Sequence, residues 1–239
     1  MPPITTTFED DLAVVSMDDG KANAMNLEFL SALSDAFDEV ARSEALAVAL
    51  LGRPRFFSGG IDLKAYAGYD EQQRERHTRA LAGALMKVFA FGRPVVAGVT
   101  GHAIAGGALL AFACDLRVMA PEVKIGTNEV ALGVNVPDFG LAITEAAFPR
   151  HMYTELLLHG TMLPSQEALK YGLVSEVVEY VSDRAKERAR QLAKSVGRDA
   201  YEVTKKRIRQ PIVDRAMATL DRDIAGFVRG VTALARPGK

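Results

Sequence analysis

Two glycine-rich segments of the sequence could bind an oxyanion through their main-chain amides. One covers residues 57–63 (FSGGIDL) and the other covers residues 101–110 (GHAIAGGALL). Each is predicted to follow a strand directly and to open into a helix. Glycine lets a backbone approach a ligand closely, and the N-terminus of a helix presents unpaired amide donors with partial positive charge. The pair therefore indicates an oxyanion-binding site, although two merely tight strand-to-helix turns would give the same glycine content.

Other functions of such segments are disfavoured. Neither segment contains the G-x-G-x-x-G of a dinucleotide site, and the second lacks the Lys-Ser/Thr ending of a Walker loop. Ser58 stands in an FSGG context without the G-x-S-x-G pattern of a serine-hydrolase nucleophile. His102 lies inside the second segment, but no carboxylate motif adjoins it, so we predict a structural or surface role.

Glu129 is the candidate base. It ends the stretch IGTNE and precedes an apolar run that contains Val130, Leu132 and Val134. A carboxylate in an apolar, water-poor pocket has a raised pKa, and a positioned general base contributes about 10²–10⁴-fold to a rate. A glutamate before an apolar run can equally lie on a solvated face, so this pattern alone leaves both interpretations open.

Short β-branched runs alternate with helical stretches, which predicts an α/β fold. Asn26 is a suitable N-cap for an amphipathic helix that ends near Arg42. A second amphipathic helix is expected before Gly92, and the polar segment 66–79 ahead of it is predicted to be a mobile surface loop. The expected strands cover residues 12–17, 46–51, 95–99, 116–119 and 174–178.

Composition limits the possible partners. The chain has 239 residues, of which 49% are hydrophobic and 25% charged, with a formal net charge of −1. That balance fits one large domain, or a domain with an appendage, and gives no sign of nucleic acid or an anionic membrane as partner. The basic cluster at residues 205–209 (KKRIR) has no interleaved aromatic residue. We interpret it as a solvated helix face or a phosphate contact.

The single cysteine and the N-terminal residues help to predict the cellular location of the protein. The single Cys114 excludes an intrachain disulfide and a cysteine-built zinc site, and we predict that it is a small core hydrophobe. The start MPPITTTFED has no pattern of an import signal, and no apolar run approaches the roughly 18 residues of a membrane span. A cytoplasmic location is therefore expected.

Several motifs in the same order together indicate a family. They are Asn23-Ala24, the F-S-x-G-x-D-L segment at residues 57–63, residues 101–115 with their Cys-Asp ending, IGTNE at residues 125–129, and ALKYGLV at residues 168–174. In this order and spacing the sequence resembles the crotonase (enoyl-CoA hydratase/isomerase) superfamily over essentially the whole chain.

The resemblance implies a fold and an assembly. It predicts an α/β, crotonase-like fold with a core spiral of repeated β-β-α units in residues 1–182. Charged, helix-favouring sequence without strand signals predicts that residues 183–239 are helical, with a break at Pro211, and the resemblance implies that this C-terminal region serves oligomerisation. A homotrimer, or a dimer of trimers, follows by analogy.

The resemblance also implies roles for particular residues. The amides of Ile61 and Gly106 would form the oxyanion hole for a thioester oxygen, with Glu129 as the base. The acyl-CoA substrate would bring its own coenzyme A, so neither a further cofactor nor a metal is expected. Asp62 is expected to cap the following helix. The residues expected to contact CoA are Lys21, Ala22, Ala24, Ser58, Gly59, Gly60 and, near a phosphate, Lys64.

Position 109 bears on the reaction. Family hydratases resemble one another in having two glutamates that activate a water, and the first would fall where this chain has Leu109, which we place in the substrate pocket. A single carboxylate suits migration of a double bond from C3 to C2 through a dienolate, and the segments look closest to Δ3,Δ2-enoyl-CoA isomerases. The alternatives are a hydratase of fatty acid β-oxidation that recruits Asp138 or Glu145, and a crotonase-fold binding protein without catalysis. Decarboxylase and thioesterase activities also stay open.

Overall fold

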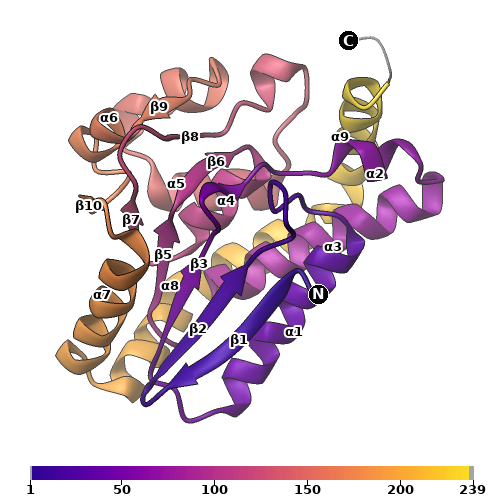
Figure 1. The fold of residues 1–239 in the computed structure, drawn as a ribbon. Helices are drawn as coiled ribbons and strands as arrows, with labels where there is room; N and C mark the ends of the chain where they lie inside the picture. Colours follow the sequence, from indigo (N-terminus) through magenta and orange to yellow (C-terminus); the bar gives the residue numbers. More distant parts are fainter. Residues whose placement is uncertain (1, 237–239) are drawn as a thin grey trace.

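Two sheets form the centre of the molecule. The computed structural model describes residues 2–236 (Figure 1). The larger sheet has the order β1-β2-β3-β5-β7-β10 and the smaller has the order β4-β6-β8-β9. Both sheets are parallel except for the β1–β2 and β8–β9 pairs. The strands are β1 Ile4–Glu9, β2 Leu12–Met17, β3 Ala47–Leu51, β4 Arg55–Ser58, β5 Val95–Val99, β6 Gly101–Ile104, β7 Leu116–Met119, β8 Lys124–Gly126, β9 Leu163–Pro164 and β10 Glu176–Val177.

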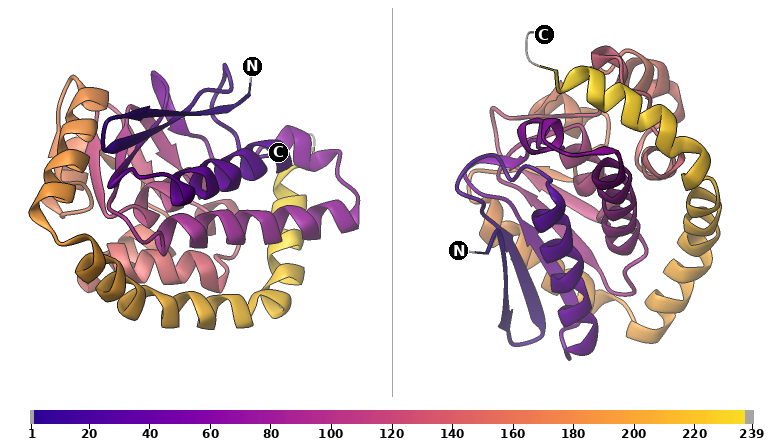
Figure 2. Two further views of the ribbon diagram at one scale, coloured as in Figure 1. Left: turned by 90° about the horizontal axis from the view of Figure 1, so that it is seen from below. Right: turned by 90° about the vertical axis from the view of Figure 1, so that its right-hand side faces the viewer.

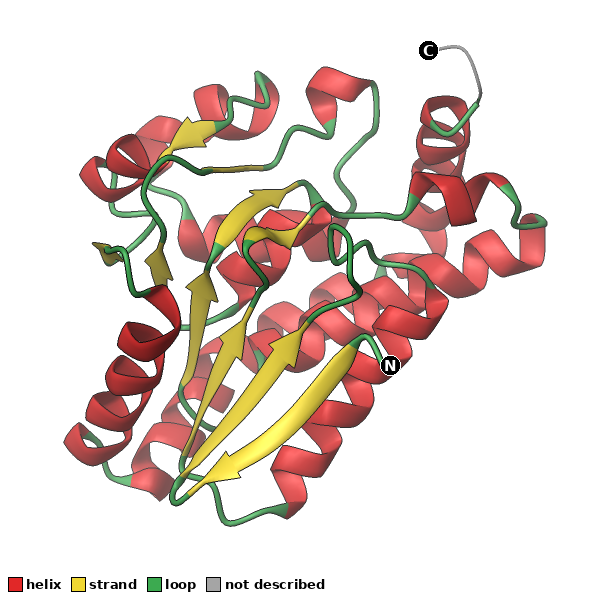
Figure 3. Ribbon diagram, viewed as in Figure 1, coloured by secondary structure: helices red, strands yellow, loops and turns green. Residues whose placement is uncertain are grey.

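Helices cover the sheets and complete the mixed α/β architecture that the alternating pattern predicts (Figure 3). They are α1 Leu27–Arg42, α2 Leu63–Ala67, α3 Glu71–Phe89, α4 Gly106–Ala113, α5 Asp138–Ala147, α6 Ser165–Lys170, α7 Val181–Ser195, α8 Arg198–Ala218 and α9 Leu220–Leu234. Short turns η1 Val130–Leu132, η2 Arg150–Met152 and η3 Thr154–Leu158 connect some of them. None of the helices in residues 2–236 combines the length and the apolar character needed to cross a membrane.

The central strands of the larger sheet, β2, β3 and β5, are buried on both faces, which explains their continuous apolar sequences, whereas the edge strand β1 is largely exposed. Alternate residues of β2 point to opposite sides: Ala13 and Val15 enter the main core with α1 and α3, whereas Leu12 and Val14 join a second cluster. Helix α7 covers that second cluster with residues such as Ala185. The expected boundary between the α/β core and the C-terminal helical region, after residue 182, thus falls in the first turn of α7, which packs on the sheet.

The expected mobile loop at residues 66–79 is wrong. Residues 63–67 form α2, and α3 already begins at Glu71. Asp70 and Gln73 form a capping box, in which each side chain accepts from the other's backbone N–H at 2.8 and 2.9 Å. Apart from His77 and Thr78, which are buried, the polar residues of α3 that suggested a loop are good helix formers, and most of them are exposed.

Pro211 does not split the C-terminal helices where we expected. It lies inside α8, which continues to Ala218. Proline removes one i→i−4 hydrogen bond, but α8 is anchored on both sides of it, by Lys205 before and by Ala216 after, both of which are buried. In Figure 2 the segment from α8 to α9, orange to yellow, wraps around one side of the molecule.

A buried ion-pair network attaches α8 to the sheet. Asp115, which follows α4, lies 2.7 Å from the Nζ of Lys205 and 2.9 Å from a guanidinium nitrogen of Arg209. It also accepts a hydrogen bond from the backbone N–H of Val95, at the start of β5. The predicted solvated face of the 205–209 cluster is therefore wrong for Lys205, which is 6% exposed and serves as a structural cation.

Replacing Asp115 should destabilise the fold strongly. In Asp115→Ala the Lys205 ammonium would stay buried without its counter-charge, so we expect the free energy of unfolding to fall by about 3–5 kcal/mol. Urea denaturation measures this loss. Glu145→Ala is the matched control, because it breaks an exposed pair with Arg215 and should cost less than about 1 kcal/mol. Equal losses in the two variants would contradict the structural role of the network.

Candidate active site

The loop between β4 and α2 presents a main-chain amide. The N–H of Met25 donates to the carbonyl of Gly60 at 2.8 Å, and the N–H of Asp62 donates to the carbonyl of Met25 at 3.3 Å. Met25 therefore pairs with the residues on both sides of Ile61, and the Ile61 N–H points the other way. Within residues 2–236 this amide has no protein acceptor. Asp62 caps α2 as expected, accepting from the Ala65 N–H at 2.9 Å.

The start of α4 presents a second amide. Gly106 is the first residue of this helix, so its N–H belongs to the helical amides that lack an intrahelical partner. The preceding Ala105 has φ +51° and ψ −122°, a conformation that costs energy for a non-glycine residue. A 3.0 Å hydrogen bond from the Ala105 N–H to the Gly126 carbonyl holds it in place.

The two turns touch through their backbones. At Gly60, with φ +82°, an added Cβ would lie 2.9 Å from the Ile104 carbonyl oxygen and 3.2 Å from the Gly106 nitrogen. A Cβ at Gly107 would lie only 2.2 Å from the Ser58 carbonyl oxygen. Side chains at these positions would push the turns apart, so the glycines let both amides reach one place.

Both turns open on one apolar cavity of about 100 Å³. Asn128 and Glu129 supply its only polar side chains among the described residues, and Leu109 forms part of the wall. The lining residues are Gly59, Ile61, Leu63, Leu81, Ile104, Ala105, Gly106, Leu109, Asn128, Glu129, Leu132, Val134, Pro137, Phe139, Phe227, Val231 and Leu234. The structure thus brings Ile61, Gly106, Leu109 and Glu129 together.

Glu129 is a buried acid without a counter-charge. It follows β8 directly before η1 and is 8% exposed. Its Oε2 has no hydrogen-bond partner among residues 2–236. Burial in this apolar wall raises the pKa of Glu129 to about 7, because the charged form loses its hydration. A carboxyl group with that pKa can take and return a proton near neutral pH.

The alternative second carboxylates lie elsewhere. Asp138 pairs with Arg222 at 2.9 Å, and the exposed Glu145 pairs with Arg215 at 3.3 Å. Neither lines the cavity. The hypothesis that one of them joins Glu129 is therefore wrong for this arrangement of the chain.

Of the residues expected to contact CoA, Gly59 lines the cavity. Its N–H donates to the Ala22 carbonyl at 2.8 Å. Ser58 is fully buried, and its hydroxyl donates to the Asn23 carbonyl at 2.7 Å and accepts from the Gly60 N–H at 3.2 Å. The visible role of Ser58 is thus to shape the turn.

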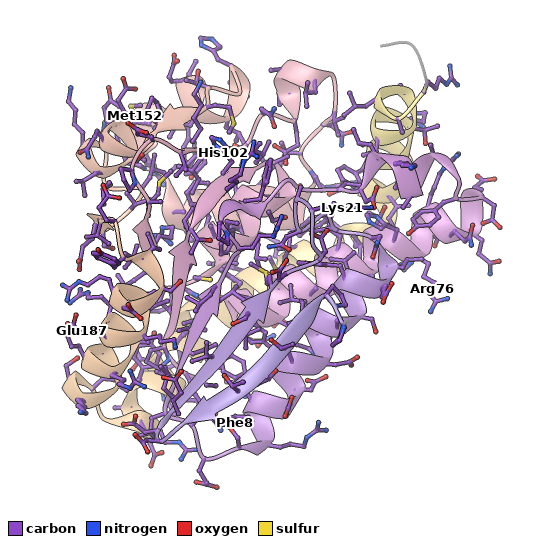
Figure 4. All side chains as sticks on the ribbon, viewed as in Figure 1. Phe8, Lys21, Arg76, His102, Met152 and Glu187 are labelled. Atoms are coloured by element: carbon purple, nitrogen blue, oxygen red, sulfur yellow. The ribbon has the colours of Figure 1, made fainter. Side chains whose placement is uncertain are left out.

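The charged residues expected at CoA lie in exposed positions. Lys21, labelled in Figure 4, lies in the loop between β2 and α1, and Lys64 lies in α2; both are exposed. Ala22 and Ala24 are half-buried. His102, also labelled, lies on β6, where its Nδ1 accepts from the Lys124 N–H at 3.0 Å, an arrangement that fits the structural or surface role predicted for it.

Sequence reasoning missed two parts of the site. Phe227, Val231 and Leu234 of α9 close the cavity, although their spacing of four and three residues was a visible sign of an apolar helix face. Asn128 belongs to the motif IGTNE, but the sequence pattern assigned it no role. Its side-chain oxygen is buried without a partner in the described part of the chain.

Comparisons with known proteins define the family. Residues 7–232 match the enoyl-CoA hydratase/isomerase family. The chain is 34% identical to the carnitinyl-CoA dehydratase of Salmonella enteritidis over 186 residues, which cover 76% of this chain and 70% of that protein. It is also 34% identical to a putative enoyl-CoA hydratase of Thermus thermophilus over 194 residues, covering 79% of this chain and 76% of that protein.

Solved structures agree with this match. A Mycobacterium tuberculosis protein named an enoyl-CoA isomerase superposes with a TM-score of 0.87 at 34% identity, over 94% of this chain and 98% of that one. The human mitochondrial Δ3-Δ2-enoyl-CoA isomerase gives a TM-score of 0.86 at 26% identity, over 98% of this chain and 94% of that one. The chain thus has the crotonase fold, which these enzymes share. The chain belongs to the enoyl-CoA hydratase/isomerase family, which confirms the resemblance found in its motifs.

Neutralising Glu129 should stabilise the protein at high pH. The pKa of Glu129 is about 7 in the folded state and has the ordinary value of 4.5 in the unfolded chain. Its contribution to the free energy of unfolding is therefore fully present below pH 4.5 and is lost as the pH rises through 7. Glu129→Gln cannot ionise. Its advantage over the wild type should grow between pH 4 and pH 8 by up to about 3 kcal/mol, at 1.36 kcal/mol per pKa unit.

Denaturant unfolding at several pH values measures this difference. Glu155→Gln is a control of opposite sign: the hydrogen bond from Thr161 lowers the pKa of the exposed Glu155 carboxyl, so this variant should gain no stability over the wild type as the pH rises. A stability difference between wild type and Glu129→Gln that is independent of pH would show that Glu129 is ionised and solvated.

Proposed function

We propose that the protein is an enoyl-CoA isomerase that shifts a double bond from C3 to C2 of an acyl-CoA. The observation that carries this proposal is the composition of the cavity. Glu129 is its one carboxylate among the described residues, and Leu109 lines the same cavity. By the resemblance to family hydratases, position 109 is where a second carboxylate would be needed to activate water. A wall that is apolar except for Glu129 and Asn128 excludes bulk water and favours transfer of a proton within the substrate.

The proposed reaction uses one proton and one base. The Glu129 carboxylate removes a proton from C2 of a 3-enoyl-CoA, and the electron pair moves onto the thioester oxygen to give a dienolate. The double bond then forms between C2 and C3 as the same carboxyl group returns the proton to C4. No water enters, and the enzyme ends in its starting state.

The amides of Ile61 and Gly106 would serve as the oxyanion hole. Each would donate a hydrogen bond to the thioester oxygen, where negative charge develops in the dienolate. A donor of this kind typically lowers the barrier by about 2.7–4 kcal/mol in a water-poor site. The pKa of about 7 places Glu129 near the value that suits a base and an acid in turn.

The names of relatives support the proposal only at the level of the family. The similar M. tuberculosis protein is named an enoyl-CoA isomerase in one solved structure and a probable enoyl-CoA hydratase in another. Product identification must therefore decide the reaction.

The remaining expectations extend this proposal. CoA would lie along the backbone from Ser58 to Ile61, with Lys21 and Lys64 near its phosphates. Neither a metal nor a further cofactor has a step in this reaction. We also propose a homotrimer, or a dimer of trimers, acting in the fatty acid metabolism of the cytoplasm.

Incubation with 2-enoyl-CoA and 3-enoyl-CoA substrates of several chain lengths tests the function. We expect 3-enoyl-CoA to become 2-enoyl-CoA, with little 3-hydroxyacyl-CoA formed. In deuterated water the wild type should exchange the C2 proton, whereas Glu129→Gln should lose at least about 100-fold in exchange, the lower bound for a general base. Its affinity for CoA should stay near that of the wild type. Unchanged exchange in the variant would remove Glu129 from the mechanism.

Leu109 offers a second test, because a glutamate there would restore a pair of carboxylates. Leu109→Glu should raise the hydration of 2-enoyl-CoA by at least about tenfold, since two groups could hold and activate a water. Leu109→Gln is the matched control, with nearly the same shape but no ionisable group. If the wild type already hydrates 2-enoyl-CoA at a substantial rate, the alternative function of a hydratase is correct and Leu109 does not decide the reaction.

A further inference from the structure

A buried histidine on α3 is bonded to the residue that shapes the Ile61 turn. The side chain of His77 is fully buried, and its Nε2 lies 2.8 Å from the carbonyl oxygen of Met25. A carbonyl can only accept, so Nε2 carries the hydrogen and donates it. The other ring nitrogen, Nδ1, is buried without a partner among residues 2–236. Burial lowers the pKa of His77, which keeps the ring neutral.

Two tyrosines fix the orientation of this ring. Tyr66 meets it edge to face, with ring centroids 5.4 Å apart, and Tyr69 packs beside it at 5.9 Å. The hydroxyl of Tyr69 accepts a hydrogen bond from the N–H of Leu27, at the start of α1. Such aromatic contacts stabilise one geometry of the ring. His77 is therefore held with its donor toward Met25.

Met25 lies next to Ile61 and Gly106, the two residues whose amides are the proposed donors. Its N–H and carbonyl pair with Gly60 and Asp62, on either side of Ile61. Its sulfur would lie 3.4 Å from a Cβ placed at Gly106. A shift of Met25 would thus turn the Ile61 amide and loosen the packing against the start of α4.

We propose that His77 is a positioning residue of the oxyanion hole: its Nε2–H holds the Met25 carbonyl, and through Met25 it fixes the direction of the Ile61 N–H. His77 itself does not line the cavity. This inference rests on the proposed oxyanion hole but holds for an isomerase and for a hydratase alike, because both reactions polarise the same thioester carbonyl.

The polarisation of a bound thioester tests this role without turnover. A saturated acyl-CoA with ¹³C at its carbonyl is bound to each variant, and the carbonyl stretch is measured by infrared difference spectroscopy. Hydrogen bonds from the two amides should shift the stretch of the wild-type complex to lower frequency. His77→Phe keeps an aromatic ring but loses the donor, so the shift should shrink and the band should broaden.

Kinetics give a second readout. Loss of one well-aligned oxyanion donor costs about 10²–10³-fold in kcat, so misalignment in His77→Phe should cost at least about tenfold, with KM changed by less than about twofold. His77→Gln, whose amide can reach the Met25 carbonyl, should recover most of the shift and of kcat. Thr78→Val is the matched control, since Thr78 is equally buried on α3 but its hydroxyl donates to the Arg74 carbonyl instead.

The outcomes separate the two proposals. If the wild-type complex shows no shift of the carbonyl stretch, the oxyanion hole itself is wrong. When the wild type shows the shift, an identical shift and kcat in His77→Phe overturn the role of His77. Should His77→Phe fail to fold, His77→Asn replaces it, because its side chain is one methylene shorter than that of His77→Gln. A smaller carbonyl shift and a lower kcat in His77→Asn than in His77→Gln support the proposal, and equal values contradict it.

Discussion

The candidate site depends on the close approach of two main-chain turns. Gly60 and Gly107 leave no room for a Cβ, because a Cβ added at either position would lie within 3 Å of a carbonyl oxygen of the other turn. Parallel pairing of β4 with β6 sets this distance, and the helix that begins at Gly106 directs its first amide into the space that the pairing leaves. The strained Ala105 is part of the same geometry. Donors held by backbone in this way need no reorganisation when charge develops on a ligand.

The C-terminal helices complete the cavity from outside the strand core. Helix α9 contributes Phe227, Val231 and Leu234 to its wall, and its position depends on α8, which Asp115 ties to the sheet through Lys205. The apolar environment that raises the pKa of Glu129 is therefore partly built by residues about 100 positions later in the chain. The packing of α9 and the proton affinity of Glu129 are consequences of one arrangement.

The sequence predicted parts of the fold whose signals are local. Asn26 and the stripe after it defined α1, and the apolar runs of β2, β5 and β7 have the predicted ends, because such strands are buried on both faces. The family motifs placed Ile61, Gly106, Leu109 and Glu129, which the structure brings to one cavity. Short strands such as β6 (GHAI) gave no signal, since pairing with neighbouring strands rather than propensity stabilises them. The bond from His77 to Met25 crosses 52 positions, and no local pattern encodes it.

Glu129 differs from every other buried acidic or basic side chain in residues 2–236 because no opposite charge or hydrogen-bond partner compensates its buried carboxylate oxygen Oε2. Lys205 has Asp115, and the guanidinium groups of Arg93 and Arg117 donate to backbone carbonyls. His77 is kept neutral and still donates one hydrogen bond. Unpaired buried charge is costly, and a fold selected for stability alone would have placed a leucine at position 129. Glu129 instead keeps one oxygen unsatisfied beside two free amides, and that combination points to chemistry.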